Sequence, residues 1–210
     1  MSGITLGSLD LAALLCSRVC HDLISPVGAI VNGLEVLEES KDEETKTFAL
    51  DLIKKSARTG SAKLQFCRIA FGAAGSAGAQ IDTGDAESVA RGFIEDEKVK
   101  LTWKIPRIFM GKNRVKLLLN MLIIGGQAIP RGGMLTVEPI GEGENMGFRV
   151  SSTGLNARVP AVQDLLNGGS EGHTVDAHAI QPYYTGLLAK ECGIKPVIGQ
   201  EGDAIVFTAQ

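Results

Sequence analysis

Two long helical patterns fill the N-terminal third of the chain. Apolar or small side chains recur in alternating steps of three and four over residues 9–37 and again over residues 50–71. This alternation is typical of the seam of a helix packed in a bundle. A polar turn at residues 40–44 separates the two patterns, and Asp42 in this turn is a candidate N-cap for the second helix. The sequence therefore predicts an antiparallel helical hairpin.

The apolar face of this hairpin is too wide for two helices to bury. Ser17, Ile24 and Val31 lie beside the main seam of the first helix, for which Ser8 or Asp10 is a candidate cap. We expect a homodimer in which two hairpins form a four-helix bundle and cover this face. The alternative is a monomer that covers the same face with its own second domain.

The pattern changes after the second helix. Small residues at 72–79 predict a linker, and the remaining chain alternates between helical and strand periods. The predicted elements are helices at residues 87–95, 113–129, 158–166 and 181–191, a strand at 99–105, and hairpins of 134–140 with 147–152 and of 195–199 with 204–208. This order predicts an α+β fold, a sandwich with its helices on one face of a sheet. The expected domains are residues 1–75 and 76–210.

Composition argues against two classes of partner, nucleic acids and membranes. Of the 210 residues 44% are hydrophobic and 21% are charged, and the net charge is −3. A chain without a basic excess lacks the electrostatic field that nucleic-acid binding requires, so we expect no nucleic-acid partner. Neither a long uninterrupted apolar run nor an export signal is evident, and the expectation is a cytoplasmic protein without a membrane partner.

The candidate for chemistry is His21, in the middle of the first predicted helix. It lies one position off the seam, so its side chain should point away from the bundle core. Asp22 follows it directly, and Pro26 cannot donate a hydrogen bond to the carbonyl of Asp22, so a local bend is expected beside the histidine. An exposed imidazole on a rigid helix is suited to carrying a phosphoryl group.

The cysteines and the other two histidines do not indicate a second functional site. Cys16 and Cys20 lie four residues apart next to His21, but no cysteine pair has the spacing of a metal site. We interpret both as small apolar seam residues and expect no metal site. His173 and His178 belong to a polar loop region and are interpreted as surface or lid residues outside the catalytic pattern.

Sequence motifs resemble those of bacterial sensor histidine kinases. The run from His21 and Asp22 to Pro26 is similar to the signature of their dimerisation and phosphotransfer domain, and residues 76–210 resemble their ATP-binding domain with its motifs eroded. Ile124 stands where that family has a magnesium-binding Asn, Ser152 where it has the adenine-recognising Asp, Asn156 where it has a glycine after Gly154, and Tyr183 and Tyr184 where it has phosphate-contacting glycines. The lost carboxylate, metal ligand and glycines predict that ATP is not bound.

A phosphotransfer hairpin joined to a defunct nucleotide domain looks like the ChpT type of histidine phosphotransferase. This resemblance implies that His21 takes a phosphoryl group from the aspartyl phosphate of one receiver domain and gives it to the Asp of another. The implied donor is the receiver of a CckA-like hybrid kinase, and the implied acceptors are CtrA-like and CpdR-like cell-cycle regulators. Asp22 would orient the ring or share its proton. The protein would need no cofactor of its own, since the receiver would supply Mg²⁺.

A docking surface for receivers is expected on the turns around His21. Its candidate residues are Ser17, Arg18, Ile24, Ser25, Gly28, Ala29 and Asn32. Arg18 is either a phosphate or receiver contact or a plain surface charge. Two alternatives to the shuttle stay open, namely an ATP-dependent histidine kinase with divergent motifs and a non-catalytic scaffold that only docks receivers.

Overall fold

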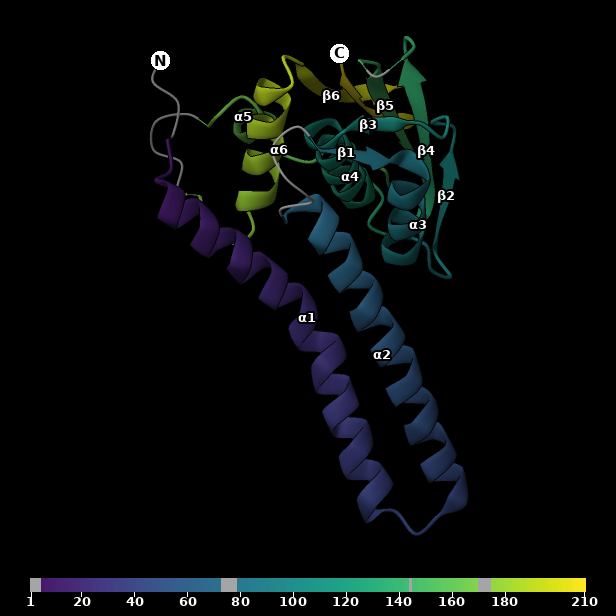
Figure 1. Ribbon diagram of the computed structural model, residues 1–210. Coiled ribbons are helices and arrows are strands. Elements are labelled where there is room, and N and C mark those ends of the chain that lie inside the picture. The colour runs from purple at the N-terminus through teal and green to yellow at the C-terminus, as the bar shows by residue number, and fades with distance from the viewer. Residues whose placement is uncertain (1–4, 73–78, 144, 170–174) are drawn as a thin grey trace.

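Two long helices project from a sandwich of helices and strands (Figure 1). The computed structural model describes residues 5–72, 79–143, 145–169 and 175–210. Helix α1 (Ser8–Glu39) and helix α2 (Glu43–Ala70) run antiparallel and form the predicted hairpin. The predicted linker and the boundary between the two expected domains lie mostly outside the described residues.

The two helices of the hairpin begin in different ways. The prediction for α2 is confirmed, because the Asp42 carboxylate accepts a hydrogen bond from the Thr45 backbone N–H at 2.8 Å. The expected cap of α1 is wrong. Gly7 is the N-cap, and neither Ser8 nor Asp10 makes a side-chain capping bond. Asp10 instead lies in the first turn, where its negative charge complements the helix dipole.

Close contacts between small and branched residues set the packing of the hairpin. Pro26 is buried inside α1, and a side chain added at Gly60 of α2 would begin 3.7 Å from Pro26 Cβ. A Cβ added at Gly33 would meet Ile53 Cγ1 at 2.7 Å, so the helices approach too closely there for a larger residue. α1 changes direction along its length, as expected for a helix that contains a proline (Figure 1).

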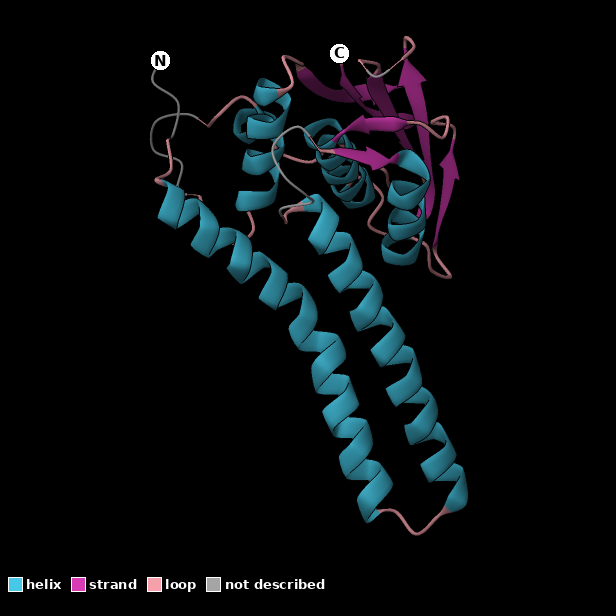
Figure 2. Ribbon diagram, viewed as in Figure 1, coloured by secondary structure: helices cyan, strands magenta, loops and turns pink. Residues whose placement is uncertain are grey.

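The sandwich places its helices on one side of a five-stranded sheet (Figure 2). Its elements are β1 (Gln80–Asp82), α3 (Thr83–Ile94), β2 (Val99–Trp103), β3 (Phe109–Gly111), α4 (Lys112–Gln127), β4 (Gly133–Ile140), β5 (Gly147–Thr153), α5 (Gln163–Leu166), α6 (Ile180–Glu191), β6 (Pro196–Glu201) and β7 (Ala204–Ala209). The sheet order is β2-β4-β5-β7-β6, with β2 parallel to β4 and the other neighbours antiparallel. The predicted α+β class and both predicted hairpins are confirmed.

Some short elements differ from the prediction. Strands β1 and β3 pair with each other and were not predicted, because three residues are too few for a strand period to show. Helix α3 begins at Thr83, four residues before the expected start, where the buried Thr83 hydroxyl donates to the Pro106 carbonyl at 2.7 Å. Helix α5 covers only the last turn of the helix predicted at residues 158–166. Pro160 disfavours a helical conformation in the residue before it.

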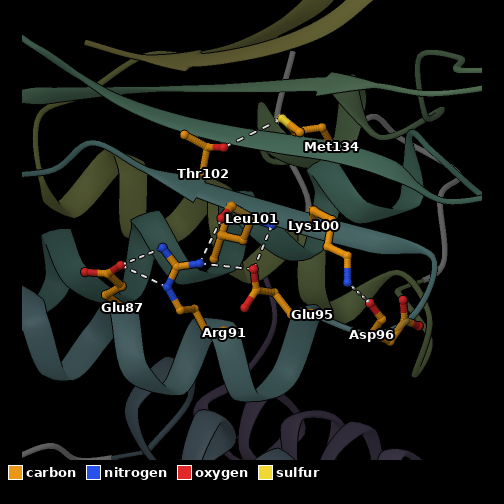
Figure 3. A network of polar contacts seen from close by, with 8 residues as sticks. All are labelled: Glu87, Arg91, Glu95, Asp96, Lys100, Leu101, Thr102 and Met134. Atoms are coloured by element: carbon orange, nitrogen blue, oxygen red, sulfur yellow. Dashed lines mark hydrogen bonds and ion pairs between the residues drawn. The ribbon is translucent and has the colours of Figure 1, made fainter.

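A polar network attaches α3 to the sheet (Figure 3). The Arg91 guanidinium pairs with Glu87 at 2.7 Å and with Glu95 at 3.0 Å, and it donates to the Leu101 carbonyl of β2 at 2.8 Å. Behind this network α4 forms the centre of the core, with a run of fully buried side chains facing both the sheet and the other helices. The hairpin joins the sandwich where α2 packs against α3 and α4.

Part of the hairpin remains uncovered. Val27, Val31 and Leu34 are exposed along α1, and this set is called the uncovered face below. Helix α6 packs on the N-terminal half of α1 only, so the second domain does not reach the uncovered face. By length and hydropathy alone, α1 also resembles a membrane-spanning helix. Its apolar side chains therefore need either a protein partner or lipid, and the charged pair described next bears on that choice.

Candidate functional site

His21 lies on the outside of α1, as its position off the seam predicts. Its side chain is 64% exposed. The backbone beneath it belongs to an unbroken helix that packs along α2, so the imidazole has a firm base while its ring stays open to an incoming molecule. This is the geometry that a phosphoryl-carrying histidine needs.

Asp22 is held in place by Arg18. The Arg18 Nε donates to Asp22 Oδ2 at 3.2 Å, and the two side chains are only 16% and 14% exposed. Asp22 is therefore not a freely solvated acid, and Arg18 is not a plain surface charge. The Asp22 Oδ1 lies 3.7 Å from His21 Nδ1, slightly beyond hydrogen-bond distance, and such contacts often tighten only when the reacting partner binds. If Nδ1 faces Asp22, the other ring nitrogen is left free.

The carbonyl that Pro26 leaves unpaired receives a partner from α2. Lys63 Nζ donates to the Asp22 carbonyl oxygen at 3.0 Å. Sequence reasoning identified the free carbonyl but missed Lys63, because the pairing depends on the register between the two helices. A charged donor thus joins α2 to the backbone next to His21 and fixes the local bend.

Cysteines surround the site without forming a metal centre. Burial, with a contribution from the negative charge of Asp22, raises the pKa of the Cys67 thiol to about 11. Cys16 and Cys20 are exposed on α1. Within the described residues no three His, Cys, Asp or Glu side chains gather as metal ligands.

The predicted docking residues lie around His21 on α1. Ser17, Ile24, Ser25 and Asn32 are exposed, and Gly28 and Ala29 are half-buried. A Cβ added at Gly28 would meet no atom within 4 Å, so the surface beside His21 is open at this point. By helix periodicity these residues share the face of α1 that carries His21, and the Arg18 side chain is already paired with Asp22.

His178 is the site residue that the sequence did not reveal. It is exposed, as predicted, and it lies next to His21, which the sequence did not indicate. Its ring centroid lies 5.6 Å from that of His21, and the two rings meet edge to face at 76°. Nothing local to residue 178 indicates this contact, because it depends on how α6 packs against α1. His173 lies outside the described residues.

Two positions that the sequence matched to the nucleotide motifs of sensor kinases lie in the packed interior. Ile124 and Ser152 are buried, and a Cβ added at Gly154 would collide with the Gly132 carbonyl. Asn156 replaces a glycine but keeps a left-handed backbone with φ of 60°, which Asn tolerates. An apolar Ile124 offers no oxygen to Mg²⁺, and the Ser152 hydroxyl cannot replace a carboxylate. Ile124 and Ser152 thus lack the metal ligand and the carboxylate that the resembling kinase motifs carry at these positions.

Helix α6 packs against α4, the helix that carries Ile124. Gln181 Nε2 donates to the backbone oxygen of Asn120 in α4 at 3.0 Å, and Asn120 Nδ2 donates to the Ala70 carbonyl at the end of α2 at 3.1 Å. Tyr183 is buried in the cluster between α6 and α1, and Tyr184 is half-buried against the core. The Gln181 and Asn120 side chains thus join α6, α4 and the end of α2.

The family follows from comparison with known proteins. Residues 83–204 match the model of the histidine phosphotransferase C-terminal domain, the class that an exposed helical histidine beside such a sandwich suggests. The chain belongs to the histidine phosphotransferase family.

Over nearly the whole chain, the sequence is similar to the ChpT type within that family. The protein phosphotransferase ChpT of Brucella abortus is 54% identical over 208 residues, which are 99% of this chain and 98% of the relative. A solved structure of a bacterial phosphotransferase is 51% identical with a TM-score of 0.90, and the match covers 100% of each chain. The resemblance drawn from the His21 motif and the eroded nucleotide motifs is thus confirmed.

Proposed function

We propose that His21 carries the phosphoryl group and that this chain shuttles it between receiver domains without using ATP. The observation that carries the proposal is the exposed His21 ring, with the Asp22 carboxylate 3.7 Å from its Nδ1. Asp22 favours the tautomer with its proton on Nδ1, which leaves the lone pair of Nε2 available as the nucleophile.

The transfer needs only a nucleophile and alignment from this chain. The Nε2 lone pair attacks the phosphorus of an aspartyl phosphate, an N–P bond forms, and the P–O bond to the receiver's carboxylate breaks. In the second step the carboxylate of another receiver attacks the phosphorus, and the electron pair of the N–P bond returns to the ring. Phosphoryl transfer passes through a loose, in-line state, so positioning and charge neutralisation dominate the barrier. Mg²⁺ held by the receiver would neutralise the phosphoryl charge.

The packing around Ile124 and α6 supports the part of the proposal that concerns ATP. The chain then depends on an external phosphoryl donor, and the ChpT-type relatives suggest which donor. We propose the receiver of a CckA-like hybrid kinase as donor and CtrA-like and CpdR-like cell-cycle regulators as acceptors, in the cytoplasm. Docking would use the surface formed by Ser17, Ile24 and Ser25 next to His21.

The uncovered face supports a homodimer. Val27, Val31 and Leu34 are apolar and exposed on a helix that also carries the Arg18–Asp22 pair. An ion pair within a lipid-spanning helix is costly, so a second hairpin is a better partner for this face than a membrane. Two copies joined here would form a four-helix bundle with His21 on its flank.

The test uses a purified receiver phosphorylated with labelled phosphate, in Mg²⁺ and without ATP. Wild type should acquire label that is stable in alkali and labile in acid, and the His21→Ala variant should acquire none. Glu35→Ala is the matched control. Glu35 is exposed on the same helix about 21 Å further along its axis, and its replacement should leave labelling unchanged.

A second arm separates the alternatives. Incubation with labelled ATP and Mg²⁺ alone should give no label on wild type, whereas incorporation at His21 would identify an ATP-dependent kinase. Binding of the receiver without any transfer would identify a scaffold.

A further inference from the structure

A second imidazole faces His21 from the other domain. His178 belongs to the turn before α6, and its ring meets the His21 ring edge to face with centroids 5.6 Å apart. Aromatic pairs prefer this arrangement, because the positive edge of one ring meets the negative face of the other. The contact leaves His21 accessible, since 64% of its side chain remains exposed.

The turn that carries His178 is rigidly held. The Asp176 Oδ1 accepts hydrogen bonds from the backbone N–H of His178 at 2.9 Å and of Ala179 at 2.8 Å. The Asp176 carbonyl also accepts from the Ile180 N–H at 2.9 Å, which starts α6. The bonds from Ala179 and His178 lower the pKa of the Asp176 carboxyl, so it remains ionised and keeps both acceptors at neutral pH.

Helix α6 is in turn anchored on α1 close to the site. Val175, Ile180 and Tyr183 are buried in one cluster with Leu11 and Leu14 of α1. The Asp176 carboxylate therefore fixes the shape of the turn, and the buried cluster holds the turn against α1. Together they set the distance from His178 to α1. A side chain from the second domain reaches the reactive ring as a consequence of this packing.

An exposed histidine without such a contact would rotate freely. Asp22 lies on one side of the ring at 3.7 Å from Nδ1, while Arg18 and Lys63 are directed at Asp22 rather than at the imidazole. In-line transfer needs one ring nitrogen aimed at the incoming phosphorus, so every other rotamer is unproductive. A second contact on the ring removes such rotamers.

We propose that His178 is a positioning residue that holds the His21 ring edge to face, so that its free nitrogen points toward the docked receiver. The inference rests on the proposed role of His21 and gives the second domain a direct part in the transfer. A ring contact of this kind is worth up to about tenfold in rate.

The test compares single-turnover transfer from a phosphorylated receiver to wild type, His178→Ala and His178→Phe. His178→Ala should lower the rate constant at saturating receiver about threefold to tenfold, while the receiver concentration at half-saturation stays unchanged. His178→Phe should restore the rate, because phenylalanine offers the same edge-to-face contact without a titratable group. The Asp176 cap uses only backbone groups of residue 178, so both variants keep the turn.

An independent readout comes from NMR of the His21 ring protons. Their ring-current shift should disappear in His178→Ala and remain in His178→Phe. Equal or faster transfer by His178→Ala, or a His178→Phe variant as slow as His178→Ala, would overturn the inference. Absence of transfer to wild type would instead overturn the proposed function, so the two failures are distinguishable.

Discussion

Replacing Lys63 by Met tests the bond that supports the backbone beside His21. Lys63 Nζ donates to the Asp22 carbonyl at 3.0 Å because Pro26 has no N–H to offer. Hydrogen bonds to charged groups contribute about 1.5–3 kcal/mol, and partial exposure lets water replace some of this. We therefore expect Lys63→Met to lower the free energy of unfolding by about 1 kcal/mol, or the Tm by about 2–4 °C.

A double-mutant cycle makes this prediction specific. In a Pro26→Ala background the new N–H of residue 26 donates to the Asp22 carbonyl, so Lys63→Met should cost little. The coupling between the two positions should be about 1 kcal/mol in urea unfolding at one fixed protein concentration. The control is Lys55→Met, which changes an exposed lysine of α2 and should alter the unfolding free energy by less than about 0.5 kcal/mol. An equal cost of Lys63→Met in both backgrounds would refute the reasoning.

Three further predictions concern the dimer, the buried thiol and the sandwich. Leu34→Glu places a charge in each half of the expected bundle, so sedimentation should show monomers, whereas Asn32→Asp on the His21 side should remain dimeric. Because burial raises the pKa of Cys67 to about 11, this thiol should resist iodoacetamide at pH 8 in mass spectrometry, and its labelling should rise as the pH approaches 11. Arg91→Met removes the bond to the Leu101 carbonyl along with two ion pairs and should lower the unfolding free energy by about 1 kcal/mol in urea titrations. Equal loss in Lys104→Met, which breaks only an exposed pair, would contradict this last prediction.

The hairpin could be predicted because its information is local. Apolar periodicity marks both helices, the Asp42 cap marks the start of α2, and the position of His21 off the seam gives its exposure. The free carbonyl of Asp22 could also be predicted, since it depends only on the Pro26 ring four residues later. Each of these features is decided within a few turns of one helix.

The remaining parts depend on contacts between distant segments. Lys63 reaches Asp22 only in the register that Gly60 and Pro26 set, and His178 reaches His21 only after Tyr183 packs against α1. Strands β1 and β3 exist because they pair with each other, since three residues have no period of their own. The sequence around residue 178 indicates only a loop before a helix, so the contact of this second imidazole with His21 appears only in the folded chain.

The central claim is that His21 is an intermediate in transfer between receivers, and a pulse–chase with two receivers tests it most directly. The first receiver carries labelled phosphate, the second is unlabelled, and samples taken over time are analysed by mass spectrometry for a phosphoryl group on His21. The account predicts that label leaves the first receiver, passes through His21 and accumulates on the second, and that His21→Ala stops this flow while still binding both. Label that reaches the second receiver equally fast with His21→Ala would contradict the account.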